Sequence, residues 1–123
     1  IVVIMDDSLV KTAHAVDGIA KGGLVVVNTC QTPRALGLNG DYRVATADAT
    51  SIAERVGLIV SGALMINTAM LGAVARASGL IDLPHIEMAL KSIFSPRAAQ
   101  KNFESARLTY EHTNCLSCMD EAI

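Results

Sequence analysis

The chain contains no tryptophan, and its two tyrosines and two phenylalanines bring the aromatic share to only 3% of 123 residues. Hydrophobic residues nevertheless make up 51% of the sequence. Any core must therefore be built from aliphatic side chains and alanine, which suits helices packed closely on a sheet. The length predicts one domain of ordinary size.

An excess of charge of one sign is also missing. Ten basic and twelve acidic residues give a net charge of −2 and are scattered singly along the chain. This balance gives no electrostatic basis for binding nucleic acid or an anionic membrane. No apolar stretch reaches the roughly 18 residues that a membrane span needs, and no signal peptide is visible. We therefore expect no nucleic-acid partner and no membrane association.

Cysteine is scarce as well. Cys30, Cys115 and Cys118 are too few and too unevenly spaced for the disulfide scaffold of a secreted protein, so we expect a cytoplasmic location. Cys115 and Cys118 form a CxxC pair, but zinc and iron–sulfur sites usually need four ligands. Only Cys30 and His112 remain as further candidates. The pair is at most a weak half-site for a metal, and two free thiols in a tail are the alternative interpretation.

The first residues predict a buried strand. Ile1–Met5 is a near-continuous apolar run, typical of a strand that is covered on both faces and has neighbours on each side. Because the chain starts directly in this run, without an initiator methionine, we expect a domain whose N-terminal part is missing. The polar residues 6–8 then cap a predicted helix over residues 9–19, and a second strand at 24–27 completes a parallel βαβ unit.

The middle of the chain has weaker signals. Residues 29–41 hold proline, asparagine and glycines and predict a loop. Residues 42–44 alternate between apolar and polar side chains, as in a half-exposed or edge strand. A capping box at 51–54 predicts a short helix, and residues 58–60 a brief strand.

The segment from Asn67 to Leu83 predicts a helix with a low surface. Gly72 and several alanines line it, and Gly79 ends it. Such a helix is suited to close approach by another backbone or by a ligand.

Two more helices are expected after it. The first starts at Leu83-Pro84 and carries an apolar stripe at helical spacing, formed by Ile86, Ala89, Leu90, Ile93 and Phe94. The second runs from about residue 97 to 110. The predicted fold is therefore α/β with three layers, a mostly parallel sheet with helices packed on it, a helical C-terminal third, and an incomplete domain.

No catalytic constellation is recognisable from spacing. Asp6-Asp7 follows a strand, as in magnesium-binding receiver domains, but the other residues of such a site are missing, and helix capping is the favoured interpretation. The glycines at 37–40 match neither a phosphate loop nor a dinucleotide fingerprint. The residues alone indicate an α/β domain without a visible active site of its own.

The order of motifs resembles that of the gamma subunit, or gamma domain, of 2-oxoacid:ferredoxin oxidoreductases, the pyruvate and ketoisovalerate group. The motifs are, in order, IVVIMDD, KGGLVVVNT, TADATSIAERVG, an NTAMLGA-type helix closing in serine-glycine, an LP-x-x-x-x-AL helix and KNFESARLTYE. The resemblance covers residues 1–111 as the gamma domain and leaves 112–123 as a tail or linker. The family's first strand and its GxGGQG-type turn have no counterpart in this sequence.

The resemblance implies a component of a thiamine diphosphate-dependent enzyme that oxidatively decarboxylates a 2-oxoacid. Electrons would leave through iron–sulfur clusters to ferredoxin, and the acyl group would usually pass to coenzyme A. Subunits or domains of alpha, beta and delta type would hold thiamine diphosphate, Mg and the clusters. This chain would bind no cofactor alone and have no catalytic residue, but pack over the active site and help to bind coenzyme A.

Candidate residues for a surface that faces substrate or coenzyme A follow from this implication. Asn67, Thr68 and Met70 lie at the entrance of a helix, and Asn28 and Thr29 at the carboxyl end of a strand, where α/β proteins bind ligands. Simple helix capping by Asn67 or Thr68 is the alternative for that pair. For the whole chain, the alternative is a non-catalytic nucleotide-binding or structural α/β module.

Overall fold

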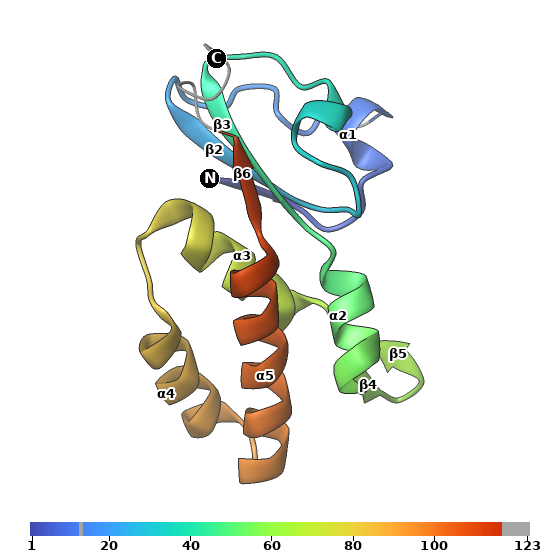
Figure 1. Cartoon of the computed structure of the whole chain (residues 1–123), viewed down its shortest axis with the longest axis vertical. Coiled ribbons are helices and arrows are strands. Elements are labelled where there is room, and N and C mark those ends of the chain that lie inside the picture. Colours follow the sequence, from blue (N-terminus) through green and yellow to red (C-terminus); the bar gives the residue numbers. More distant parts are fainter. Residues whose placement is uncertain (13, 117–123) are drawn as a thin grey trace.

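The computed structural model describes residues 1–12 and 14–116. Its elements, in chain order, are β1 (Val2–Ile4), α1 (Leu9–Thr12), β2 (Gly23–Asn28), the 3₁₀ turn η1 (Arg34–Leu36), β3 (Tyr42–Ala47), α2 (Ala49–Val56), β4 (Ile59–Val60), β5 (Ala63–Leu64), α3 (Asn67–Ser78), α4 (Leu83–Ile93), α5 (Pro96–His112) and β6 (Asn114–Leu116). Figure 1 shows the main sheet at one end of the molecule and the long helices extending away from it.

The main sheet has the strand order β1-β2-β3-β6. β1, β2 and β3 are parallel, with Ile4 opposite Val27 and Asn28 opposite Ala47. β6 joins the other side of β3 and runs antiparallel to it. The parallel-dominated α/β architecture and the helical C-terminal third predicted from sequence are therefore confirmed.

Both faces of this sheet are covered, which gives three layers. Successive residues of a strand point to opposite faces, and β2 shows this with side chains that are all buried. Val25 and Val27 pack with residues of the α1 and η1 side, whereas Leu24 and Val26 pack against α3. This two-sided burial is the reason that β2 reads as a continuous apolar run.

Three expectations about the sheet and its flanks need correction. The first strand, predicted to have a neighbour on each side, lies at the edge of the described sheet and pairs only with β2. The strand predicted at residues 42–44 is not an edge strand, because β3 lies between β2 and β6. The helix predicted over 9–19 stops at Thr12, and residues 15–18 form turns, with Gly18 at a φ of 79°. The apolar side chains of that segment still pack on the sheet, so burial rather than helix formation explains their spacing.

Part of the predicted C-terminal tail is regular in the structure. Residues 114–116 form β6, whereas residues 117–123 lie outside the described part of the chain. Strand β6 is three residues long and its pairing partner, β3, is about seventy residues earlier. So short a segment has no detectable period of its own. The division into a domain at 1–111 and a tail at 112–123 stays a prediction.

Helices α3 and α5 pack closely side by side (Figure 1). Gly72 of α3 lies against the backbone of α5, and a Cβ atom at this position would overlap the carbonyl oxygen of Ala106. The Arg76 guanidinium stacks over the Tyr110 ring, 5.3 Å from its centroid, and adds a cation–π contact. The small residues of α3 thus serve the approach of another backbone, one of the two possibilities that the sequence left open.

Helix α4 is covered on only part of its apolar side. Ile86 and Leu90 are buried against α3 and α5, whereas Ile93 is 72% exposed and Phe94, just after the helix, 40%. An apolar groove of about 280 Å³ results, called here the α3–α4 groove. It is lined by Leu71, Ile81, His85, Ile86, Ala89, Leu90 and Ile93.

The remaining elements agree with most of the sequence signals. β4, within the predicted strand at 58–60, pairs with β5 in a small antiparallel hairpin. The cap of α2 is Asp48 rather than Ser51, because the Asp48 carboxylate accepts the Ser51 amide. None of the helices in the described ranges has the length and apolarity that crossing a bilayer requires.

Candidate functional site at the strand ends

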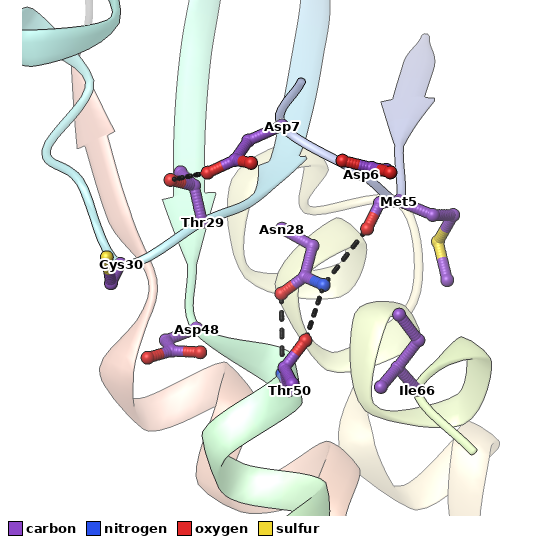
Figure 2. Close-up of a pocket in the computed structure, with 9 residues that line it drawn as sticks. All are labelled: Met5, Asp6, Asp7, Asn28, Thr29, Cys30, Asp48, Thr50 and Ile66. Carbon is purple, nitrogen blue, oxygen red and sulfur yellow. Dashed lines mark hydrogen bonds between the residues drawn. The ribbon is translucent and has the colours of Figure 1, made fainter. Parts of the chain in front are cut away.

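A large cavity lies where the parallel strands end. It has a volume of about 540 Å³ and opens between the carboxyl ends of β1, β2 and β3 and the starts of α2 and α3. Figure 2 shows the nine residues that line it, which are Met5, Asp6, Asp7, Asn28, Thr29, Cys30, Asp48, Thr50 and Ile66. This edge is where open α/β sheets bind their ligands. We call it the strand-edge pocket.

Asn28 connects the three elements that form the pocket. Its side-chain amide donates to the Met5 carbonyl oxygen at 3.0 Å and to Thr50 Oγ1 at 2.9 Å. Its Oδ1 accepts the Ala49 amide at 2.9 Å. Both N–H donors of this buried side chain are therefore used within the protein (Figure 2). Asn28 holds the pocket wall in place rather than presenting a free amide to a ligand.

Thr29 has a similar positioning role in the pocket wall. Its hydroxyl donates to Asp7 Oδ2 at 2.8 Å and accepts the Gln31 amide at 3.2 Å. This bond connects the segment after β1 to the segment after β2. The second oxygen of Asp7 receives no hydrogen bond from the described residues.

The pocket carries negative charge. Asp6, Asp7 and Asp48 contribute three carboxylates, and no lysine or arginine is among the described residues that line it. The Ser8 amide and hydroxyl both donate to Asp6 Oδ1, and these bonds lower the pKa of the Asp6 carboxyl below its ordinary value. Asp6 is therefore ionised at neutral pH.

The amide groups at the start of α2 provide no anion site. Ala49 and Thr50 direct their N–H groups to Asn28 Oδ1, and Ser51 directs its N–H group to Asp48 Oδ1. The free N–H groups that let helix starts bind phosphate are thus already occupied. Together with the three carboxylates, this arrangement favours a neutral hydrogen-bonding ligand over a phosphate group.

Two of the predicted site residues line this pocket and three do not. Asn28 and Thr29 belong to its wall. Asn67 is exposed and its Oδ1 accepts the amide of its neighbour Thr68, while Thr68 is buried and Met70 lies in the core at 2% exposure. Helix α3 reaches the pocket through Ile66, one residue before Asn67. The assignment of these residues to coenzyme A stays a prediction.

Thr50 and Asp48 also line the pocket, although no local pattern in the sequence marks them as site residues. Both lie just beyond β3, and parallel strands bring all their carboxyl ends to one edge. The sequence favours helix capping for Asp6 and Asp7, and in the structure both also line the pocket. Recognising residues 42–47 as an inner parallel strand would have pointed to Asp48 and Thr50.

Among the described residues, no three histidine, cysteine, aspartate or glutamate side chains are arranged so that they could hold a metal ion. Cys30 and Cys115 are exposed. Cys118, the other half of the CxxC pair, lies outside the described residues, so the weak half-site stays a prediction.

Comparison with known proteins identifies the family. The model of the family described as pyruvate ferredoxin/flavodoxin oxidoreductase matches residues 1–112. The chain belongs to this family. The gamma subunit resemblance found in the motifs is thereby confirmed.

The curated relatives of this family member are subunits. The common subunit gamma of pyruvate/ketoisovalerate oxidoreductases from Thermococcus litoralis is 36% identical over 116 residues, which cover 92% of this chain and 60% of the relative. Pyruvate synthase subunit PorC from Methanocaldococcus jannaschii is 34% identical over 109 residues, or 89% of this chain and 57% of the relative. The chain thus spans about 60% of the length of these relatives.

A solved structure has the same fold. The crystal structure of pyruvate oxidoreductase subunit PORC from Thermotoga maritima superposes with a TM-score of 0.78 at 30% sequence identity. The match covers 94% of this chain and 64% of the Thermotoga chain.

Proposed function

We propose that this chain is the gamma component of a 2-oxoacid oxidoreductase and acts in the cytoplasm as one part of a hetero-oligomer. The observation that carries the proposal is the family match, whose relatives are named as subunits of pyruvate and ketoisovalerate oxidoreductases. Partner chains of alpha, beta and delta type hold thiamine diphosphate, Mg and the iron–sulfur clusters. Ferredoxin accepts the electrons from the oxidised 2-oxoacid.

The α3–α4 groove supports assembly with such a partner chain. Ile93 and Leu71 expose 72% and 41% of their surface beside a floor of buried Ile86 and Leu90. Apolar grooves of this kind on a small protein mark interaction sites. Because the relatives work as subunits, the proposed occupant is another subunit of the same oxidoreductase.

Purification of the full-length native protein under mild conditions tests this role. We expect thiamine diphosphate- and cluster-bearing chains to co-purify, together with 2-oxoacid-dependent reduction of ferredoxin. A stable monomer that never associates with such chains would contradict the proposal.

The strand-edge pocket is proposed to receive the neutral pantetheine arm of coenzyme A. That arm has two amides and a hydroxyl, which match the carboxylate acceptors of Asp6 and Asp7 and the Thr50 hydroxyl. The acidic wall disfavours the diphosphate part of coenzyme A, which would lie outside the pocket. Asn28 and Thr29 would act as positioning residues, because their side chains already bind within the wall.

Kinetics of the assembled enzyme test the pocket. Thr50→Val removes the hydroxyl, and we expect the KM for coenzyme A to rise about tenfold while the KM for the 2-oxoacid stays unchanged. Thr50→Ser keeps the hydroxyl and should restore the wild-type KM. An unchanged KM in Thr50→Val, with only lower stability, would mean that the pocket has a structural role.

The Asn67 assignment has its own test. If Asn67 contacts coenzyme A, Asn67→Ala in the assembled enzyme raises the KM for coenzyme A. If its side chain only binds the Thr68 amide, the substitution lowers stability and leaves that KM unchanged.

The alternative, a nucleotide-binding module, receives no support from this pocket. The N–H groups at the start of α2 already donate to Asn28 and Asp48. The negative charge of the pocket also opposes a nucleotide phosphate. Tight nucleotide binding by the full-length protein would favour the alternative nonetheless.

A further inference from the structure

The dipeptide Asn39-Gly40 lies in the loop between η1 and β3, at the end of the sheet opposite the strand-edge pocket. Both residues are exposed and belong to no helix or strand. Asparagine is one of the chemically labile residues of proteins. In this sequence, Asn39 is the one asparagine that a glycine follows.

The two groups that would react with each other are not held by the described part of the protein. The Asn39 side-chain amide makes no hydrogen bond with a described residue, and the Gly40 N–H donates none. Because the dipeptide lies outside the hydrogen-bonded elements, its backbone can rotate without breaking a helix or a strand ladder. The Gly40 nitrogen can therefore approach the side-chain carbonyl carbon of Asn39.

The glycine makes this approach easier, and the fold requires a glycine at this position. Without a Cβ atom, Gly40 leaves its nitrogen unobstructed and its backbone free. A Cβ atom built on Gly40 would overlap a ring carbon of Tyr42. Tyr42 is 9% exposed and packs in the core on the α1 side of the sheet, so its ring has little room to move away. The packing of Tyr42 thus keeps the reactive dipeptide in the chain.

Asn67 provides an internal comparison. It is exposed as well, but it lies in α3 and is followed by Thr68, which is buried. The helix fixes the backbone of this pair, and the β-branched threonine is stiff and crowds its own nitrogen. Exposure is common to the two asparagines, whereas backbone freedom and a following glycine are found only at Asn39.

We propose that Asn39 is a site of spontaneous deamidation in the folded protein. The Gly40 nitrogen attacks Asn39 Cγ, and the new C–N bond closes a cyclic imide. The side-chain nitrogen leaves as ammonia and takes up the proton of the Gly40 N–H. Water then opens the imide at either of its two carbonyl groups, which leaves an aspartate or an isoaspartyl linkage at position 39. Water is the only other reactant.

The product changes the charge of the loop but not the strand-edge pocket. It adds a carboxylate two residues before Asp41, which pairs with Lys21 at 3.8 Å, and it makes the net charge of −2 more negative by one. The residues that line the pocket lie at the other end of the strands. The site is independent of the proposed coenzyme A pocket and would persist if that assignment failed.

Incubation of the purified full-length protein in mildly alkaline buffer, followed by peptide mass spectrometry, tests the proposal. We expect the Asn39 peptide to gain about 1 Da with time, because a hydroxyl replaces the amide NH₂. It should also become a substrate for an isoaspartyl methyltransferase. The conversion should accelerate as the pH rises, since the Gly40 nitrogen must lose its proton. The Asn67 peptide is the matched control and should keep its mass over the same period.

Asn39→Ser removes the amide from an exposed loop position and should leave the fold intact. We expect this variant to lose the acidic form that the incubated wild type shows on isoelectric focusing. A sample unfolded in urea, incubated in parallel, separates the effect of the fold from that of the sequence. The proposal is overturned if the Asn39 peptide gains mass only in urea, if the Asn67 peptide converts as fast as the Asn39 peptide, or if Asn39→Ser forms the same acidic species.

Discussion

Helices α3 and α4 follow each other in the chain and both have apolar sides, but α3 is largely covered by the rest of the molecule, whereas α4 is covered on only part of its apolar side. On α3, Gly72 and Ala73 are buried, and the backbone of α5 lies directly against Gly72. On α4, Met88 and Ile93 are 69% and 72% exposed. The small residues of α3 thus form a contact completed within the chain, whereas α4 leaves large apolar side chains exposed.

Substitutions on the two helices should therefore have different free-energy costs. A close backbone crossing has no room for a larger side chain, because folded interiors are packed as densely as crystals. Full burial of an isoleucine side chain is favourable by about 1.5–3 kcal/mol relative to leaving it exposed. An exposed isoleucine can therefore contribute this free energy to binding when a partner subunit covers it. The comparison therefore predicts large effects on stability at α3 and large effects on assembly at the outer side of α4.

The largest effect is expected at the crossing. Gly72→Leu would force α5 away from α3, so we expect a loss above the roughly 1–3 kcal/mol of ordinary overpacking. Urea unfolding monitored by circular dichroism measures it. Leu71→Ala, one residue away and facing the α3–α4 groove, should cost far less. Equal losses for the two variants would mean that the crossing is not tight.

The inner side of α4 comes next. Leu90 is 4% exposed and packs in the cluster formed by α3, α4 and α5. Leu90→Ala should lower the free energy of unfolding by about 2–3 kcal/mol, within the usual range for such a truncation. Thermal and urea unfolding check this value. A change near zero would show that α4 is not anchored to the other helices.

The outer side of α4 should show the reverse pattern. Ile93→Ser is expected to change the stability of the separate chain by no more than about 0.5 kcal/mol, as surface substitutions do. Its assembly with partner subunits should weaken strongly, as measured by co-purification or analytical ultracentrifugation. Met88→Ser is the control, since Met88 is equally exposed but does not line the groove. Normal assembly of Ile93→Ser would remove the groove from the interface.

The smallest effect concerns the salt bridges of α5. Arg107 hydrogen-bonds to Glu104 and lowers the pKa of that carboxyl, and it also pairs with Glu111 at 2.8 Å. Because the pKa of Glu104 is lower in the folded chain than in the unfolded chain, its ionised form stabilises the fold at pH values above the ordinary glutamate pKa. This stabilisation is lost as the pH falls through the lowered pKa of the folded state. Because the pair is partly exposed, its contribution to stability is small.

An NMR titration of the Glu104 carboxyl checks this interaction. Arg107→Gln should raise the pKa of Glu104 toward its ordinary value, whereas Arg97→Gln should leave it unchanged. Similar titration curves for Glu104 in the wild type and in Arg107→Gln would argue against the bond.

The sequence predicted much of the fold where the signals are local. The apolar run of β2, the helix over α3 with Gly79 at its end, and the proline start of α4 are confirmed. Predictions failed where partners are distant. β3 resembled an edge strand because its second neighbour, β6, is a three-residue strand far along the chain.

The candidate site divides in the same way. Asn28 and Thr29 were predicted from the rule that ligands bind at strand ends, and both line the pocket. Thr50 was missed because its place depends on the parallel pairing of β3. The full use of the Asn28 side chain could not be predicted either, since its partners Met5 and Thr50 are more than twenty residues away on either side.

By itself, the sequence determined the aliphatic α/β character, the order of elements and the family, because apolar period, caps and motif order are local properties of the chain. Only the tertiary structure decided which apolar sides are covered, that Gly72 meets the backbone of α5, and that the buried Thr46 hydroxyl has no hydrogen-bond partner among the described residues. The reason is physical: burial and hydrogen bonding depend on neighbours that folding brings from distant positions. The local spacing of residues in the sequence does not indicate which distant residues become neighbours.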